Sequence, residues 1–292
     1  MVNSNSSFKI KNNLYMSTSR ILFSLSLCLF LAACKQSAPP DIQLPDEKGS
    51  LFFSGYYFNY KNADNPVGPG PNRFAGNAES AYVDSLGRLH LKILKKNNFW
   101  YSSEIISVKE FKYGTYTFTC ETDIRNFDQK VVFGFFTWDD YSFQTQGNSE
   151  IDIEFAKWDV ANDSNLVTYS AQPVWFSTPG PYKERTFKPA IPTKYISKTA
   201  TYMMRWTSDS IAWESYEGET YPGANKVSKW GFNKNNIPRS KIENSLTSNP
   251  IVVPQPSDST NLRFNFWLLN GVAPVNGQNH EIIIKNFTYK PL

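Results

Sequence analysis

Apolar and polar residues follow a strand-like pattern in short runs from residue 51 onward, and no long stretch has the spacing of an amphipathic helix. Alternation with a period of two is typical of strands that bury one face. The runs cover 88–94, 114–124, 131–138, 150–155, 167–172, 202–206, 211–216, 262–269 and 281–289. Clusters of Gly, Pro, Asn and Asp separate them, as between the strands of a β-sandwich. We therefore predict one all-β domain over residues 51–292.

Two segments of this domain lack such a run. Residues 64–72 are rich in Pro and Gly and are predicted to form a loop without regular structure. Residues 217–261 are polar and rich in Pro, and a long loop is predicted there as well. Run 131–138 is apolar on both faces, which indicates a central strand covered on both sides. The alternation predicts core positions for Leu89, Leu91, Ile93, Tyr116, Phe118, Cys120 and Ile124, with His90 pointing outward.

Run 150–155 combines this alternation with three acids. Ile151, Ile153 and Phe155 would face a core, which leaves Glu150, Asp152 and Glu154 in one row on the opposite face. Like charges in a row repel one another, so stability alone does not favour the arrangement. Chemistry that needs carboxyl groups in different protonation states does favour it. A surface strand of acids and a calcium site are the alternatives.

Composition argues against several other functions. The net charge is only +4, with scattered Lys and Arg, so nucleic-acid binding is not expected. The two histidines, His90 and His280, lie far apart and no GxSxG motif is present, which argues against a His-based zinc site and a Ser-His-Asp triad. Cys120 alone lies in the body of the chain, so no disulfide framework or CxxC metal site exists. The 8 Trp and 16 Tyr suit a protein that stacks on sugar rings.

The N-terminal segment contains an apolar run, 21–31, that follows Arg20 and is too short to span a membrane. Its end, Leu-Ala-Ala-Cys34, resembles the lipobox of bacterial lipoproteins, in which the cysteine is lipidated. We therefore expect a signal peptide at 1–33, with Met16 as a plausible true start, and a Pro-containing tether at 34–50. The expected location is outside the cytoplasm, anchored by lipid to the cell envelope at the outer membrane. An uncleaved signal or a plain secretory cleavage site is the alternative.

The run Glu150-Ile-Asp-Ile-Glu154 resembles the signature of glycoside hydrolase family 16, which is E-hydrophobic-D-hydrophobic-E. Segments 100–104, 113–116 and 265–271 resemble others of that family, in the same order. The resemblance implies a concanavalin A-like jelly roll of two curved antiparallel sheets with an open concave cleft for a polysaccharide. A monomer without a cofactor is expected. Some relatives bind a structural calcium ion, but no cluster of Asp and Asn marks such a site here.

The resemblance also implies the roles of the three acids. Glu150 would be the nucleophile and Glu154 the general acid/base, with Asp152 between them modulating both. A charged Glu150 would raise the pKa of Glu154. Residues four apart on a flat strand have Cα atoms roughly 13 Å apart, whereas retaining enzymes hold their carboxyl groups about 5–5.5 Å apart. Flat geometry alone would suggest inversion, so the expectation of retention comes from the resemblance.

The short form of the motif is found in lichenases, which favours a β-1,3/1,4-glucan as the substrate. An endo-acting retaining hydrolase is the leading interpretation, and a transglycosylase is the second. A galactan hydrolase for agar or carrageenan also stays open, because the sequence does not show whether Arg73, Arg185 or Arg205 lines the cleft. A carbohydrate-binding lipoprotein without activity is the interpretation from another class.

Further residues are predicted to bind the substrate. Five tryptophans are candidate sugar platforms: Trp100, Trp138, Trp158, Trp175 and Trp267. On run 262–269, Phe264, Phe266 and Leu268 are predicted in the core, which leaves Asn265 and Trp267 facing the cleft. Gln172 is predicted on a strand next to the acidic one, and Glu104 as a polar residue that reaches the cleft. Trp206 and Trp213 are predicted in the core.

Overall fold

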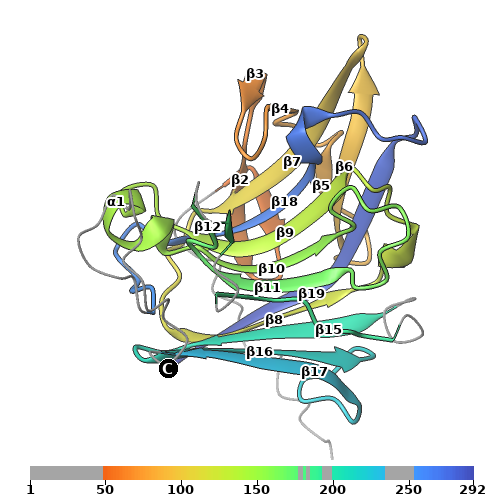
Figure 1. The fold of residues 1–292 in the computed structure, drawn as a ribbon. Coiled ribbons are helices and arrows are strands. Elements are labelled where there is room, and N and C mark those ends of the chain that lie inside the picture. The colour runs from red at the N-terminus through yellow and green to blue at the C-terminus, as the bar shows by residue number, and fades with distance from the viewer. Residues whose placement is uncertain (1–48, 177–179, 182–184, 193–198, 234–252) are drawn as a thin grey trace, which may run out of the picture. The chain divides into compact units, whose positions relative to one another are not determined.

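The computed structural model (Figure 1) describes residues 49–176, 180–181, 185–192, 199–233 and 253–292. All of them belong to one compact unit, Leu44–Leu292. The predicted signal peptide, Cys34 and nearly all of the predicted tether lie outside the described residues. No helix in the described part of the chain is long and apolar enough to cross a membrane.

Two antiparallel sheets lie face to face in this unit (Figure 1). We call the first the cleft sheet, and its strands follow the order β14-β11-β10-β9-β18-β7-β2-β1. Its bounds are Thr186–Phe187 (β14), Val167–Ala171 (β11), Ile151–Ala156 (β10), Val131–Trp138 (β9), Asn261–Leu268 (β18), Phe99–Ser107 (β7), Tyr56–Tyr60 (β2) and Leu51–Phe53 (β1). Runs 131–138 and 150–155 pair with each other, as β9 and β10.

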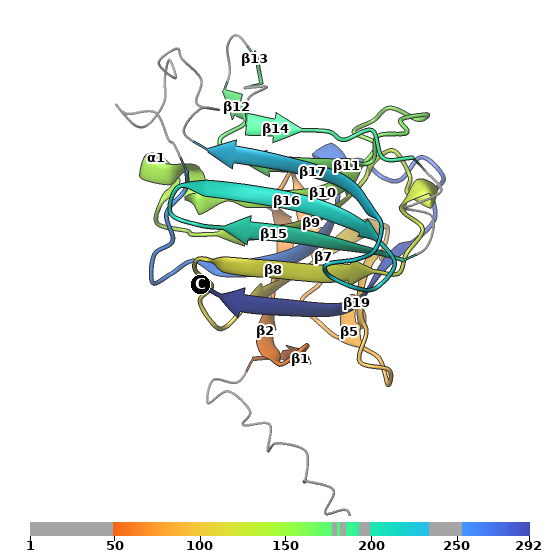
Figure 2. The same cartoon turned by 90° about the horizontal axis from the view of Figure 1, so that it is seen from below.

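The second sheet, which we call the outer sheet, faces the viewer in Figure 2. Its strands follow the order β17-β16-β15-β8-β19-β6-β5. Their bounds are Lys226–Asn233 (β17), Ser210–Glu217 (β16), Ala200–Trp206 (β15), Gly114–Cys120 (β8), His280–Pro291 (β19), Leu89–Lys96 (β6) and Ala81–Val83 (β5).

The remaining elements join the sheets or border the cleft. A short ladder between the ends of β6 and β7 connects the two sheets by hydrogen bonds. β3 (Ala63–Val67) pairs with β4 (Asn72–Phe74), and β4 runs parallel to β7, so this hairpin rises beside the cleft sheet (Figure 1). The other described elements are η1 (Ile124–Asn126), α1 (Phe143–Gln146), η2 (Gly147–Ser149), β12 (Trp175–Phe176), β13 (Gly180–Pro181) and η6 (Leu269–Gly271).

The core lies between the sheets and consists of the apolar residues of the alternating runs. Burial of this apolar area is the main stabilising contribution to such a fold. Core positions predicted from the sequence and found buried include Leu89, Leu91, Ile93, Tyr116, Phe118, Cys120, Ile124, Ile151, Ile153, Phe155, Trp206, Trp213, Phe264, Phe266 and Leu268.

Three predictions of secondary structure were wrong. β17 forms within the predicted loop 217–261, and β3 and β4 occupy most of 64–72. β17 lies at an edge of the outer sheet with little of its length buried, so it has no strong alternation to detect. These strands are held in place by hydrogen bonds to neighbouring strands, and a short run of sequence does not show which strands will pair. Run 114–124 ends its strand at Cys120, and the buried Ile124 begins the short helix η1 instead.

Candidate active site

The three acids of β10 lie in the middle of the cleft sheet, on the face that points away from the core. β10 pairs with β9 on one side and with β11 on the other, so Asp152 lies between Phe136 and Ser170. A cleft of about 220 Å³ opens above them and is lined by all three carboxyl residues. Asp152 is 2% exposed at its floor, while Glu150 and Glu154 stay partly exposed. The predicted row of acids is therefore placed where a ligand has access to it.

The backbone before Glu150 has an unusual conformation. Gly147, Asn148 and Ser149 all have positive φ, at 56°, 63° and 50°. This region is unfavourable for residues other than Gly, so surrounding contacts must hold it. The Asn148 side chain donates to the Asp139 carbonyl (2.8 Å), and the Ser149 hydroxyl donates to the Gln255 carbonyl (2.9 Å). These two bonds fix the direction in which the chain enters β10 and hence the position of Glu150.

Asp152 is held from two directions. Its Oδ2 accepts hydrogen bonds from the Ser170 hydroxyl (2.9 Å) and from Gln172 Nε2 (3.2 Å). Its backbone carbonyl accepts from the indole of Trp213, a core residue of the outer sheet, at 3.0 Å. Gln172 is held by the fully buried Arg185, whose Nη2 donates to the Gln172 carbonyl at 2.7 Å. Asp152 is thus rigidly positioned, as a group that orients its neighbours must be.

Burial raises the pKa of all three carboxyl groups, because removal from water disfavours the charged form. The charge of Asp152 raises the pKa of Glu150 and Glu154 further, whereas Arg263 lowers that of Glu150. Hydrogen bonds limit the effect on Asp152, whose pKa rises to about 6. The predicted direction for Glu154 is found, although burial and Asp152 cause it rather than Glu150. The upward shift of the Glu154 pKa is in the direction that an acid catalyst requires.

The raised pKa of Asp152 predicts how stability depends on pH. A carboxyl group whose pKa is higher in the folded state than the ordinary 3.8 binds its proton more tightly when folded. Its contribution to stability is full below about pH 4 and is lost as the pH rises through about 6. We expect Asp152→Asn to remove part of this loss, so that its Tm rises relative to the unmodified protein between pH 4 and pH 7. Thermal unfolding followed by circular dichroism measures this difference.

Asp258→Asn is the matched control, since the ion pair with Lys112 lowers the pKa of that exposed carboxyl. Its contribution to stability is present above about pH 4 and is lost only as the pH falls below that, so the Tm difference between this variant and the unmodified protein should stay nearly constant between pH 4 and pH 7. An Asp152→Asn difference that stays constant or shrinks over the same range would contradict the prediction.

A second charged group lies beside the acids on the cleft floor. Glu104 is 2% exposed and binds Lys61 (3.1 Å) and Arg263 (3.3 Å) with different oxygens. Lys61 also donates to the Gly68 carbonyl at 2.6 Å, which ties the β3–β4 hairpin to the sheet. Arg263 also contacts Asp140 at 3.3 Å. Both cations that line the cleft within the described residues are therefore already paired.

Asn265 lies in one row with Glu104, Gly134 and Glu154 across four neighbouring strands. It is 3% exposed, and its Oδ1 has no hydrogen-bond partner. A Cβ at Gly134 would lie 2.5 Å from that oxygen, so only glycine leaves room for the Asn265 amide to extend over β9 toward Glu154. An unpaired buried acceptor is costly unless a ligand completes it. This amide is positioned to accept a hydrogen bond from a ligand in the cleft.

Of the predicted tryptophan platforms, two line this cleft, Trp138 and Trp267. Trp138 donates to Asp140 (2.6 Å), and its ring lies 5.2 Å from the Arg263 guanidinium. Trp158 packs with Trp267 in a small cluster beside it.

Trp100 does not line this cleft, because it lies in the β6–β7 ladder opposite Lys95 and its partly buried ring packs against the main core. The side chain of Trp175 lies outside the described part of the structure.

Comparison with known proteins reports on the fold. No protein-family model and no curated protein matches this sequence. A laminarinase from Flavobacterium sp. UMI-01 is similar in structure, with a TM-score of 0.53 and 16% identity, over 80% of this chain and 92% of that chain. A lichenase from a mouse hindgut metagenome is similar with a TM-score of 0.50 and 18% identity, over 80% of this chain and 94% of that chain. The Bacillus licheniformis β-glucanase is similar with a TM-score of 0.50 and 17% identity, over 80% of this chain and 92% of that chain. The chain has the fold of laminarinases and lichenases. The predicted jelly roll is confirmed.

Sequence reasoning missed several residues of the cleft. Arg263, Asn265 and Trp267 occupy every second position of β18, so alternation places their side chains on the same face. The position of Arg263 in the cleft was therefore predictable from the sequence. No sequence pattern indicated Lys61, Gly68 or Gly134 as cleft residues, because their positions depend on the packing of strands that are distant in the sequence.

The three arginines whose place the sequence left open all lie elsewhere. Arg73 stacks on Phe99, with 4.3 Å from its guanidinium carbon to the ring centroid. Arg185 is buried beneath Gln172, where its Nε donates to the Ala171 carbonyl. Arg205 belongs to the outer sheet.

Metal ligands are the last group to consider. Among the residues that the structure describes, no three His, Cys, Asp or Glu side chains are grouped as metal ligands are.

Proposed function

We propose that this protein is an endo-acting glycoside hydrolase that cleaves a β-linked glucan, most favourably a β-1,3/1,4-glucan, with retention of configuration. The observation that carries the proposal is the row of Glu150, Asp152 and Glu154 on the floor of an open cleft, with raised pKa values, in the fold of laminarinases and lichenases. A fold by itself does not define an activity. These three residues are what link this chain to hydrolysis.

The proposed reaction proceeds in two displacements. Glu150 attacks the anomeric carbon while Glu154 donates its proton to the glycosidic oxygen, and the bond between that carbon and that oxygen breaks. Glu154 is then ionised and removes a proton from a water molecule, which attacks the same carbon and releases Glu150. The side-chain hydrogen bond with Asp152 orients Glu150 but favours its protonated form, whereas the positive charge of Arg263 favours the ionised form that attacks.

A neutral polysaccharide fits the charges of the cleft better than a sulfated galactan does. A sulfate group needs a cation that is free to bind it. Lys61 and Arg263, the cations that line the cleft within the described residues, are both occupied by Glu104. Three further carboxyl groups would repel a sulfate ester. This favours glucan over agar or carrageenan as the chain that is cleaved.

The location of the enzyme is part of the same proposal. Polysaccharides are too large to enter a cell intact, so an enzyme that cleaves them must act outside the cytoplasm. The apolar run 21–31 and the lipobox-like Leu-Ala-Ala-Cys34 support export and attachment of Cys34 to lipid in the cell envelope.

A reducing-sugar assay on a panel of polysaccharides tests the proposal. The panel contains β-1,3/1,4-glucan, β-1,3-glucan, agar and carrageenan, and product lengths are measured by mass spectrometry. We expect the highest rate on β-1,3/1,4-glucan, with products of intermediate length that indicate internal cleavage. Products longer than the starting chains would show a transglycosylase. Binding without turnover on every polysaccharide would contradict the assignment as an enzyme.

A further inference from the structure

A second depression lies on the outer sheet, on the side of the sandwich away from the acids. It encloses about 670 Å³ and is formed by outward-pointing residues of β8, β15 and β19. The connection between β16 and β17 borders it, and in Figure 2 this connection lies in front of one end of these strands. Lys285 of β19 pairs with Glu219 of that connection at 2.6 Å, which holds the border in place. We call this depression the outer groove.

Hydroxyl groups form the floor of the outer groove. Thr115, Thr117 and Thr119 alternate along β8, with their side chains on the outward face. Thr119 bonds to the hydroxyl of Thr201 on the neighbouring strand (3.0 Å), and Thr117 bonds to that of Thr288 on the other side. Each hydroxyl has both donor and acceptor capacity. Thr117, Thr119 and Thr201 are buried at the bottom of the groove, whereas Thr115 and Thr288 keep exposed surface. The hydroxyl groups of Thr115 and Thr288 are therefore the ones that a ligand rich in hydroxyl groups can reach.

Two cations flank Thr115 in one row across the sheet. Thr115 pairs with Arg205 on one side and with Lys290 on the other. Neighbouring strands lie about 4.8 Å apart, so the backbones of the two cationic residues are roughly 10 Å apart. Both side chains are exposed, and within the described residues neither forms an ion pair or a hydrogen bond.

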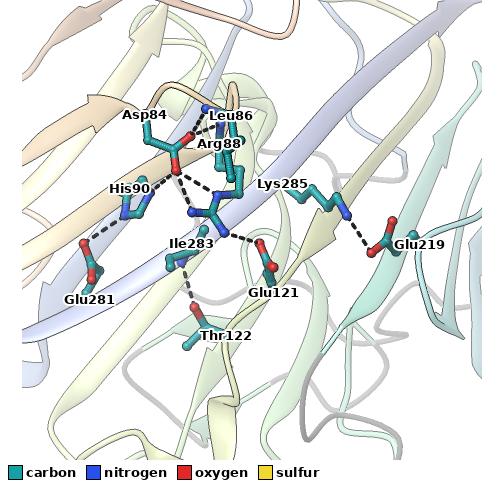
Figure 3. A network of polar contacts seen from close by, with 10 residues as sticks. All are labelled: Asp84, Leu86, Arg88, His90, Glu121, Thr122, Glu219, Glu281, Ile283 and Lys285. Carbon is teal, nitrogen blue, oxygen red and sulfur yellow. Dashed lines mark hydrogen bonds and ion pairs between the residues drawn. The ribbon is translucent and has the colours of Figure 1, made fainter.

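The charges beside the outer groove are paired, in contrast to these two (Figure 3). Arg88 binds Asp84 (2.7 Å) and Glu121 (3.1 Å), and His90 contacts Asp84 and Glu281 (2.9 Å to the latter). His90 does point outward, as predicted, but these contacts bury it. Arg205 and Lys290 are therefore two cations available to bind an anion from outside.

An aromatic side chain completes the outer groove. Tyr221 lines it from the β16–β17 connection, and its ring meets that of Tyr216 edge-on, with centroids 5.6 Å apart. This contact holds the Tyr221 ring at the border, where an apolar face is presented to a ligand. Hydroxyls, an aromatic ring and a few charged groups together are the chemistry that binds sugars.

We propose that the outer groove is a second polysaccharide site, which binds a chain segment carrying sulfate or carboxylate groups. The acidic group would lie between Arg205 and Lys290, and the sugar rings along the threonines toward Tyr221. Nucleic acids are a poorer fit, because their backbone requires many more cations than two. The proposal does not depend on the catalytic function, since binding at this groove involves none of the cleft residues.

Native gels that contain a polysaccharide test the proposal with the full-length chain. Gels with carrageenan, polygalacturonate or neutral β-1,3/1,4-glucan distinguish sulfate, carboxylate and no charge, and mobility is compared with a gel lacking polysaccharide. We expect retardation in at least one acidic gel. The double variant Arg205→Ala/Lys290→Ala should weaken this affinity about 10-fold or more, because hydrogen bonds to charged groups are lost. Its activity in the cleft should not change.

The control is Lys96→Ala/Lys109→Ala, which removes two exposed cations that do not line the outer groove and gives the same net charge. It should be retarded like the unmodified protein. Tyr221→Ala should weaken retardation as well, because a sugar chain uses the ring and a bare anion site does not.

Three results would overturn the proposal. They are equal retardation of both double variants, an absence of retardation in both acidic gels, and sedimentation with anionic phospholipid vesicles in place of polysaccharide binding. Full retardation of Tyr221→Ala would overturn the assignment to a sugar chain.

Discussion

Replacement of Glu150 by glutamine is expected to reduce kcat/KM on the preferred glucan by about 10³-fold or more, as loss of a nucleophile does in other enzymes. Glutamine has nearly the same shape but cannot form the covalent intermediate. The fold should be retained, because burial already disfavours a charge at this position and raises the pKa of Glu150. We expect an unchanged or higher Tm at pH 7. Reducing-sugar assays and thermal unfolding on one preparation measure both quantities.

Glu121→Gln is the matched control for this experiment. Glu121 is a partly exposed carboxyl that pairs with Arg88 on the outer side of the sandwich. Its replacement should leave hydrolysis within about twofold, since surface ion pairs contribute little. Normal turnover by a folded Glu150→Gln protein would disprove the role of the residue.

Replacement of Glu154 by alanine is expected to lower kcat/KM about 10²- to 10⁴-fold on polysaccharide, which is the usual range for general acid catalysis. The loss should be much smaller for an aryl glycoside, because an acidic phenol leaves without being protonated. This dependence on the leaving group distinguishes an acid catalyst from a residue that only binds substrate. Parallel kinetics on a glucan and on its nitrophenyl glycoside measure it.

Azide provides the decisive comparison between the two glutamates. In Glu154→Ala, azide attacks the glycosyl-enzyme, and two displacements give a β-glycosyl azide. In Glu150→Ala, azide replaces the nucleophile, and a single displacement gives the α anomer. Proton NMR of the products identifies each anomer. The same anomer from both variants would contradict the division of roles, and an inverted sugar from the unmodified protein would contradict retention.

The strands that form the centre of each sheet were predictable from the sequence. In β9, β10 and β18 the residues that belong to the main core recur at every second position, and burial of that face requires the pattern. Most residues on the cleft side of these central strands are buried as well. Edge and border strands such as β3, β4 and β17 were missed because they bury little and depend on their neighbours. The pattern of apolar and polar residues therefore does not predict strands that are held mainly by pairing with their neighbours.

The candidate site divides in the same way. The three acids were predicted from their motif, and Asn265 and Trp267 from their alternating positions on β18. All five line the cleft. Trp100 was predicted in the cleft, but its ring packs against the main core where β7 pairs with β6. The ion pairs of Glu104 join segments that lie more than 40 residues apart or across the whole domain, at Lys61 and Arg263, so a local reading does not reach them.

The sequence by itself determined that this chain forms a β-sandwich and that Glu150, Asp152 and Glu154 share one face of one strand, because alternation is a property of the strand. The tertiary structure decided which distant residues meet them. Packing of β9, β10, β11 and β18 places Ser170 and Gln172 on Asp152 and opens space over Gly134 for Asn265. The pKa values of the acids also depend on that packing, since burial and neighbouring charges exist only once the sheets have assembled.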